Sequence, residues 1–109
     1  MKKIGIDIVE NTRIKLNDEF LKKFLTKQEM TYLKSVQSTQ RQIEFAAGRW
    51  AVKEAIFKVL TKTEHLAFNQ IEIAYDAEKC PIILNSELAN IAISISHERH
   101  FSVAVAMQN

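Results

Sequence analysis

The feature that most constrains the fold is a long helical segment that is apolar on two opposite faces. Ser38-Thr39 provides a helix start signal, and the segment from Arg41 to about Thr61 contains no proline and one glycine. At about 100° per residue, apolar side chains fall on two sides of this helix: Ile43, Ala47, Trp50 and Phe57 on one, and Phe45, Val52, Ile56 and Val59 on the other. Such a helix must be covered twice, so we expect it at the centre of the molecule.

Alternating apolar residues predict strands before and after this helix. The segment from Lys3 to Val9 alternates strictly, with three isoleucines on one face and Gly5, Asp7 and Val9 on the other. We also expect a strand at 70–75, a shorter one at 81–84, and a hairpin of 91–95 and 101–107. The expected fold class is α+β, with a small antiparallel sheet packed against the long central helix.

Two capping patterns predict short helices between the first strand and the long helix. Asn17-Asp18 is suited to cap a helix from about Glu19 to Leu25. Thr26, followed three residues later by Glu29, forms a capping-box pattern that starts another helix, which runs to about Ser35. We expect two short helices or one kinked helix.

Composition is that of one compact domain, which we expect to span residues 1–109. The chain has 109 residues, of which 47% are apolar, and only two glycines and one proline. A domain of this size buries only about two-thirds of the surface of its unfolded chain, so a partner subunit is a natural way to complete the core. The single Cys80 cannot form an intrachain disulfide, and the N-terminus lacks a signal-peptide pattern. We expect a cytosolic location and, because apolar runs are short, no membrane span.

Charge is distributed unevenly along the chain. Residues 1–60 carry 12 basic and 7 acidic side chains, and residues 61–109 carry 3 and 6, so the net charges are +5 and −3. Seven of the basic side chains of the first half are suited to an acidic partner or a phosphate backbone: Arg13, Lys15, Lys22, Lys23, Lys27, Lys34 and Arg41. A solvated helix surface explains the same residues, and both interpretations stay open.

Two carboxylates occupy positions where apolar side chains are expected. Glu54 falls inside the first apolar row of the long helix, one turn before Lys58, and needs either that cation or a metal ion as a partner. Asp7 lies between two isoleucines of a strand, where aspartate is disfavoured, and faces either solvent or the helix. In the second case Asp7 and Glu54 converge and offer the hard oxygen ligands that Mg²⁺ takes.

His97 lies at the end of a strand, in the kind of turn that often displays functional side chains. It is either a hydrogen-bonded turn residue or a phosphate contact. His65 and His100 show no metal-ligand spacing with Cys80, which argues against zinc. The sequence has no Walker loop, nucleotide-binding glycine fingerprint or nucleophile elbow.

Three sequence blocks, taken in order, carry a resemblance to a known family. They are Gly5-Ile6-Asp7-Ile8-Val9-Glu10, Glu44-Phe45-Ala46-Ala47-Gly48-Arg49-Trp50-Ala51-Val52-Lys53-Glu54-Ala55 and Ile93-Ser94-Ile95-Ser96-His97. Together they resemble the acyl carrier protein synthase family of phosphopantetheinyl transferases, over essentially the whole chain. The resemblance implies the 4'-phosphopantetheinyl transferase fold. It also implies transfer of the 4'-phosphopantetheine arm of coenzyme A to a serine of apo acyl carrier protein, with release of adenosine 3',5'-bisphosphate.

The resemblance also implies a magnesium-dependent catalytic centre. Asp7 and Glu54 match the family's Mg²⁺ ligands, and Lys58 matches a lysine near the donor phosphates that protonates or stabilises the leaving group. The general base that activates the acceptor serine is either Glu54 or a metal-bound water, and the sequence does not choose between them.

Four further basic residues match positions that contact the two substrates. Arg49 and His97 match positions near the nucleotide phosphates of the donor, whereas Arg13 and Arg41 match residues that face the acidic carrier protein. Members of the family are typically homotrimers with sites between subunits, which agrees with a helix that is apolar on two faces.

Two other functions compete with this hypothesis. The basic first half is compatible with a nucleic-acid-binding module, although no aromatic stacking platform or binding motif supports one. A magnesium-dependent phosphohydrolase would use similar carboxylates without a carrier protein.

Overall fold

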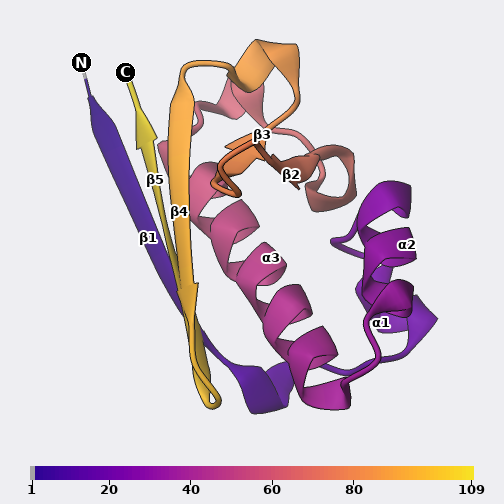
Figure 1. Cartoon of the computed structure of the whole chain (residues 1–109). Helices are drawn as coiled ribbons and strands as arrows, with labels where there is room; N and C mark the ends of the chain where they lie inside the picture. The colour runs from indigo at the N-terminus through magenta and orange to yellow at the C-terminus, as the bar shows by residue number, and fades with distance from the viewer. Residues whose placement is uncertain (1) are drawn as a thin grey trace.

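The long helix lies between a sheet and a layer of short helices and turns, as Figure 1 shows for the computed structural model, which describes residues 2–109. The helix is α3 (Thr39–Val59), and the antiparallel sheet has the order β1 (Lys3–Glu10), β5 (Phe101–Gln108), β4 (Ile91–His97). The opposite side of α3 carries α1 (Asp18–Leu21) and α2 (Lys27–Ser35), and a separate hairpin pairs β2 (Ile73–Tyr75) with β3 (Pro81–Ile83). The predicted α+β class is confirmed. No helix among residues 2–109 is both long and apolar enough to cross a membrane.

Local hydrogen bonds explain where the helices start and end. The Ser38 hydroxyl accepts from the Arg41 amide (3.3 Å), and the capping box of Thr26 and Glu29 forms as predicted. The helix expected to end near Leu25 ends at Leu21, because the chain tightens into bonds between residues three apart, including Phe24 N to Leu21 O at 3.1 Å.

The strand expected from residue 70 begins only at Ile73. Gln70 belongs to a 3-10 turn, η3 (Phe68–Gln70), which the Ile71 amide closes by donating to Phe68 O at 3.2 Å. Three further 3-10 turns connect the elements: η1 (Asn11–Arg13), η2 (Lys62–Glu64) and η4 (Ser86–Leu88).

The two buried sides of α3 differ in detail from the predicted rows. Ile43 and Trp50 are only half-buried and Phe57 is 43% exposed, so the first predicted row is partly wrong. The residues of the helix that are fully buried are mostly small or charged: Ala46, Ala47, Ala51, Val52, Lys53, Ala55, Ile56 and Val59. A prediction from hydropathy gives alanine little weight and excludes lysine, which explains the error. In the structure, small side chains allow the sheet to approach the helix closely.

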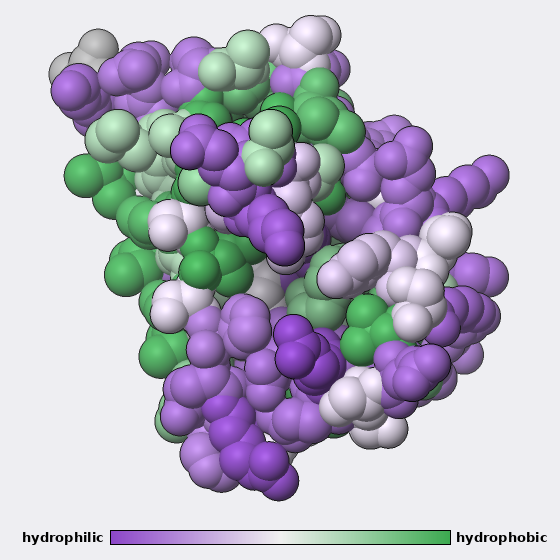
Figure 2. All heavy atoms as spheres, in the orientation of Figure 1, coloured by the Kyte–Doolittle hydropathy of each residue, from purple (hydrophilic) through white to green (hydrophobic). Residues whose placement is uncertain are grey.

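The strand register separates an inner from an outer face of the sheet. Asp7 pairs with Ala104, which pairs with Ile95, and this row faces α3. The outer face carries apolar rows from β1 and β5, and Ile4, Ile6 and Ile8 are 70%, 61% and 63% exposed. Figure 2 shows hydrophobic side chains gathered along the side of the molecule that the sheet occupies.

The closest approach of sheet and helix occurs at Gly5. A Cβ atom at this position would lie 2.3 Å from the backbone oxygen of Ala55 and 3.0 Å from Lys58 Cβ. Only glycine therefore lets β1 lie against the last turns of α3. The contact also brings the side chain of Asp7, two residues along the strand, toward the helix.

We predict that Gly5→Ala destabilises the protein by about 1–3 kcal/mol, because the added methyl group meets a backbone atom that cannot rotate away. Equilibrium urea unfolding measures the change. Gly48→Ala is the matched control: its methyl group meets only a side-chain carbon of Ile95, at 3.1 Å, and alanine gains about 1 kcal/mol in helix propensity. Equal stability of the two variants would contradict this account of the β1–α3 contact.

Candidate active site

Asp7, Glu54 and Lys58 meet where β1 crosses the C-terminal half of α3. Lys58 Nζ donates to the carbonyl oxygen of Ile6 (2.6 Å) and lies 3.5 Å from Asp7 Oδ1. Burial raises the pKa of Glu54, the negative charge of Asp7 raises it further, and Lys58 opposes both effects. Of the two partners expected for Glu54, Lys58 pairs with Asp7 instead, and no ion pair joins Glu54 to Lys58 among residues 2–109.

The carboxylate pair fits a magnesium ion. Both carboxylates are half-buried, and after burial the negative charge of Asp7 is the second cause that raises the pKa of Glu54, so a divalent cation between them would remove that repulsion. No cluster of three or more histidine, cysteine or acidic side chains suited to a metal exists within the described residues. Mg²⁺ needs none, since it is commonly held by one or two carboxylates together with waters and substrate phosphates.

A second group of functional side chains lines a cavity of about 240 Å³ at the N-terminal half of α3. Four of its lining residues are basic: Arg41, Arg49, Lys79 and His97. His97 Nδ1 lies 3.1 Å from Glu44 Oε1, which fixes the imidazole at the cavity wall. Lys79 has a φ of 65°, a left-handed conformation that turns the β2–β3 connection sharply. The cavity is suited to an anion.

Arg49 is held rigidly at this cavity. Its side chain is 4% exposed, and its guanidinium carbon lies 4.4 Å from the ring centroid of Phe45 and 5.0 Å from that of Tyr75. Its Nε atom is buried and has no hydrogen-bond partner, although Glu29 Oε2 lies 3.8 Å away. A buried cation that lines a cavity is well placed to receive a phosphate.

The two arginines predicted to face a carrier protein are both exposed and lie on different elements, η1 and α3. Arg41 is exposed and lines the cavity. Arg13 is exposed in η1, directly after β1, and is not part of the cavity lining. Their shared role stays a prediction.

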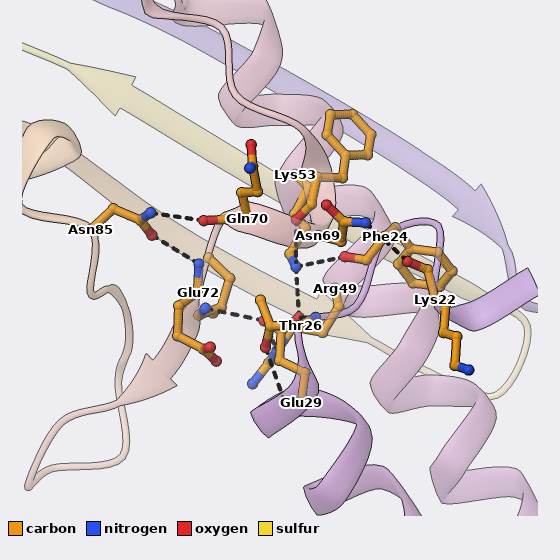
Figure 3. A network of polar contacts seen from close by, with 12 residues as sticks. Lys22, Phe24, Thr26, Glu29, Arg49, Lys53, Asn69, Gln70, Glu72 and Asn85 are labelled. Carbon is orange, nitrogen blue, oxygen red and sulfur yellow. Dashed lines mark hydrogen bonds and ion pairs between the residues drawn. The ribbon is translucent and has the colours of Figure 1, made fainter. Parts of the chain in front are cut away.

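Sequence reasoning missed the buried ion pair behind the cavity. Lys53 is fully buried, and its Nζ lies 2.6 Å from Glu29 Oε1 (Figure 3). The capping box had given Glu29 a local role at the start of α2, so nothing pointed to its contact with α3. The signal that could have indicated this ion pair was Lys53 itself, a lysine at a helix position flanked by buried residues.

Comparison with known proteins identifies the family. The sequence model described as ACPS, 4'-phosphopantetheinyl transferase superfamily, matches residues 3–106. This chain belongs to that superfamily. The holo-(acyl-carrier-protein) synthase of Mycoplasma capricolum subsp. capricolum is 47% identical over 105 residues, which cover 96% of this chain and 92% of the relative. The holo-(acyl-carrier-protein) synthase of Staphylococcus aureus is 36% identical over 107 residues, which cover 93% of this chain and 89% of the relative.

A solved structure of the superfamily has the same fold. The holo-(acyl-carrier-protein) synthase from Bacillus anthracis, crystallised in complex with CoA (3',5'-ADP), superposes with a TM-score of 0.83 at 37% identity, covering 96% of this chain and 93% of that one. The phosphopantetheinyl transferase fold predicted from the three sequence blocks is therefore confirmed.

We predict that Glu54→Gln stabilises the metal-free protein at pH 7. The folded state raises the pKa of Glu54, so an ionised Glu54 destabilises that state above the raised pKa, and the penalty vanishes below about pH 4, where the carboxyl is protonated in both states. Thermal melts with and without MgCl₂ measure this effect, and Mg²⁺ should raise the melting temperature of the wild type but not of the variant.

Glu64→Gln is the control. Hydrogen bonds from Thr61 lower the pKa of Glu64, so its neutralisation should slightly destabilise the protein and leave the Mg²⁺ response intact. A wild type that gains no stability from Mg²⁺ would argue against an ion at Asp7 and Glu54.

Proposed function

We propose that this chain transfers 4'-phosphopantetheine from coenzyme A to a serine of apo acyl carrier protein, in a magnesium-dependent reaction in the cytoplasm. Membership of the superfamily and the names of the relatives support the reaction. The observation that carries the assignment to this chain is the meeting of Asp7, Glu54 and Lys58 at the β1–α3 contact.

In this proposal Asp7 and Glu54 hold Mg²⁺, which neutralises negative charge on the donor pyrophosphate when bound. The serine oxygen forms a bond to the phosphorus that carries the pantetheine arm, and the bond to the bridging oxygen breaks. The serine hydroxyl gives its proton to a general base, Glu54 or a water beside it, and the released adenosine 3',5'-bisphosphate takes the negative charge. Lys58 is held at Asp7 by the carbonyl of Ile6, so its ammonium group stabilises that leaving charge.

The basic cavity is proposed to bind the nucleotide end of coenzyme A. Arg49 and His97 would contact its phosphate, and Arg41 at the rim, with Arg13, would face the acidic carrier protein. On α3, Arg49 and Glu54 point about 140° apart, so one protomer does not present both groups to a single surface.

Assembly into a homotrimer is proposed to unite the two groups. The outer face of the sheet carries a row of three exposed isoleucines, Ile4, Ile6 and Ile8, and contiguous apolar surface of this kind marks an interface. In a trimer, this isoleucine row and the neighbouring apolar rows of β5 would pack against the adjacent protomer. The carboxylates of one protomer would then meet the basic cavity of the next.

We predict that the purified chain, with Mg²⁺ and coenzyme A, adds the mass of one phosphopantetheine arm to apo acyl carrier protein. Intact-mass spectrometry measures the product. Asp7→Ala and Glu54→Ala should lower the rate at least about a hundredfold, since each removes a ligand of the ion that neutralises the pyrophosphate. No mass shift on any of several carrier proteins would reject the proposed function.

We predict that Ile6→Glu yields a monomer without transfer activity, because the charge lies at the centre of the exposed row. Light scattering after size-exclusion chromatography measures the mass. Leu84→Glu is the matched control, since Leu84 is also exposed, at 52%, but follows β3 away from the sheet. An active monomeric Ile6→Glu protein would contradict a site shared between copies.

A further inference from the structure

One carboxylate joins three separate elements behind the basic cavity. Glu29 Oε1 accepts from Lys53 Nζ (2.6 Å) and from the Thr26 amide (3.0 Å), and Oε2 accepts from the Ile73 amide (3.0 Å) while lying 3.8 Å from Arg49 Nε. Figure 3 shows these groups converging from α2, α3 and the start of β2. Glu29, Arg49 and Lys53 are 3%, 3% and 0% exposed.

The hydrogen-bond donors of this cluster are not all used. Lys53 uses its three donors on Glu29, Phe24 O (2.7 Å) and Phe68 O (3.0 Å), so it and the carboxylate satisfy each other. Arg49 is left with an unused donor: its Nε is buried without a hydrogen-bond partner, 3.8 Å from Glu29 Oε2. The rings of Phe45 and Tyr75 cover its two faces.

Stability alone does not account for this arrangement. A buried ion pair contributes little net stability after desolvation, and a second buried cation with an unused donor makes the folded state less stable. Arg49 lines the cavity, so a phosphate entering there would place a negative charge beside this buried cation. Glu29 restrains both the Nε edge of Arg49 and the first residue of β2, the strand that carries Tyr75 onto the guanidinium.

We propose that Glu29, supported by Lys53, is a positioning residue that orients Arg49 toward the 3'-phosphate of coenzyme A. The inference rests on the proposed function, because the pyrophosphate is assigned to Asp7 and Glu54 and the 3'-phosphate is the donor phosphate that remains. Glu29 itself touches no substrate. Its carboxylate orients Arg49, the buried cation that contacts the substrate.

The test compares Glu29→Gln with the wild type on two donors, coenzyme A and 3'-dephospho-coenzyme A. The KM for coenzyme A should rise about tenfold, as expected when a charge-assisted phosphate contact is misaligned. The kcat, and the KM for the dephospho donor, should each stay within about twofold, since neither depends on this contact. A residue that only supports the fold would affect both donors equally, and that result would overturn the proposal.

Two further variants separate positioning from folding. Glu29→Gln/Lys53→Met removes both charges of the pair, so it should fold even if the single variant does not, yet should keep the same selective loss for coenzyme A. A double variant that binds coenzyme A like the wild type would overturn the proposal. Glu72→Gln is the matched control, a half-buried carboxylate near Lys53 that forms no ion pair or hydrogen bond with Arg49 among residues 2–109, and it should leave the preference between donors unchanged.

Calorimetric titration with adenosine 3',5'-bisphosphate tests the positioning role of Glu29 independently of transfer activity. If the wild type transfers nothing to carrier proteins, the function fails. The positioning role is still supported if Glu29→Gln weakens bisphosphate binding about tenfold and leaves adenosine 5'-phosphate binding unchanged. Equal weakening for both nucleotides contradicts it.

Discussion

The contact between Gly5 and the backbone of Ala55 is the constraint on which the rest of the site depends. Because no side chain separates β1 from α3, the strand lies directly against the last turns of the helix, and Asp7 extends toward Glu54 and Lys58 instead of into solvent. Other small residues of α3 serve the same purpose, since Ala51 and Ala55 are fully buried and a Cβ atom at Gly48 would lie 3.1 Å from Ile95 of β4. Close packing of small residues thus sets the position of the charged ones.

The opposite side of α3 is organised by charge. There the helix buries Lys53 and Arg49, one turn apart, around the single carboxylate of Glu29. Burial lowers the pKa of Lys53, and the carboxylate beside it counters that shift, so the lysine and the glutamate are retained as a pair. Arg49 lines the cavity beside this pair. On one side α3 therefore presents the carboxylate of Glu54, which is suited to a metal cation, and on another side it presents Arg49, which is suited to an anion.

The sequence predicted the elements whose signals are local and missed the contacts that depend on tertiary packing. Strict alternation identified β1 and the β4–β5 hairpin, and side-chain caps identified the starts of α2 and α3. The three family blocks identified Asp7 and Glu54, while periodicity left their meeting open, because alternation says which residues share a face but not what covers that face. The Glu29–Lys53 pair was missed since its partners are 24 residues apart and each residue is ordinary in its own helix.

The central claim is that the carboxylates of one copy act with the basic cavity of another. Subunit mixing tests it most directly: Glu54→Gln and Arg49→Met, each inactive alone, are unfolded, combined in equal amounts and refolded, and carrier-protein modification is followed by mass spectrometry. A shared site predicts that about a quarter of the sites in randomly mixed trimers regain both intact halves, so activity returns. Activity that stays at the level of the separate variants, in trimers shown to be mixed, would contradict the claim.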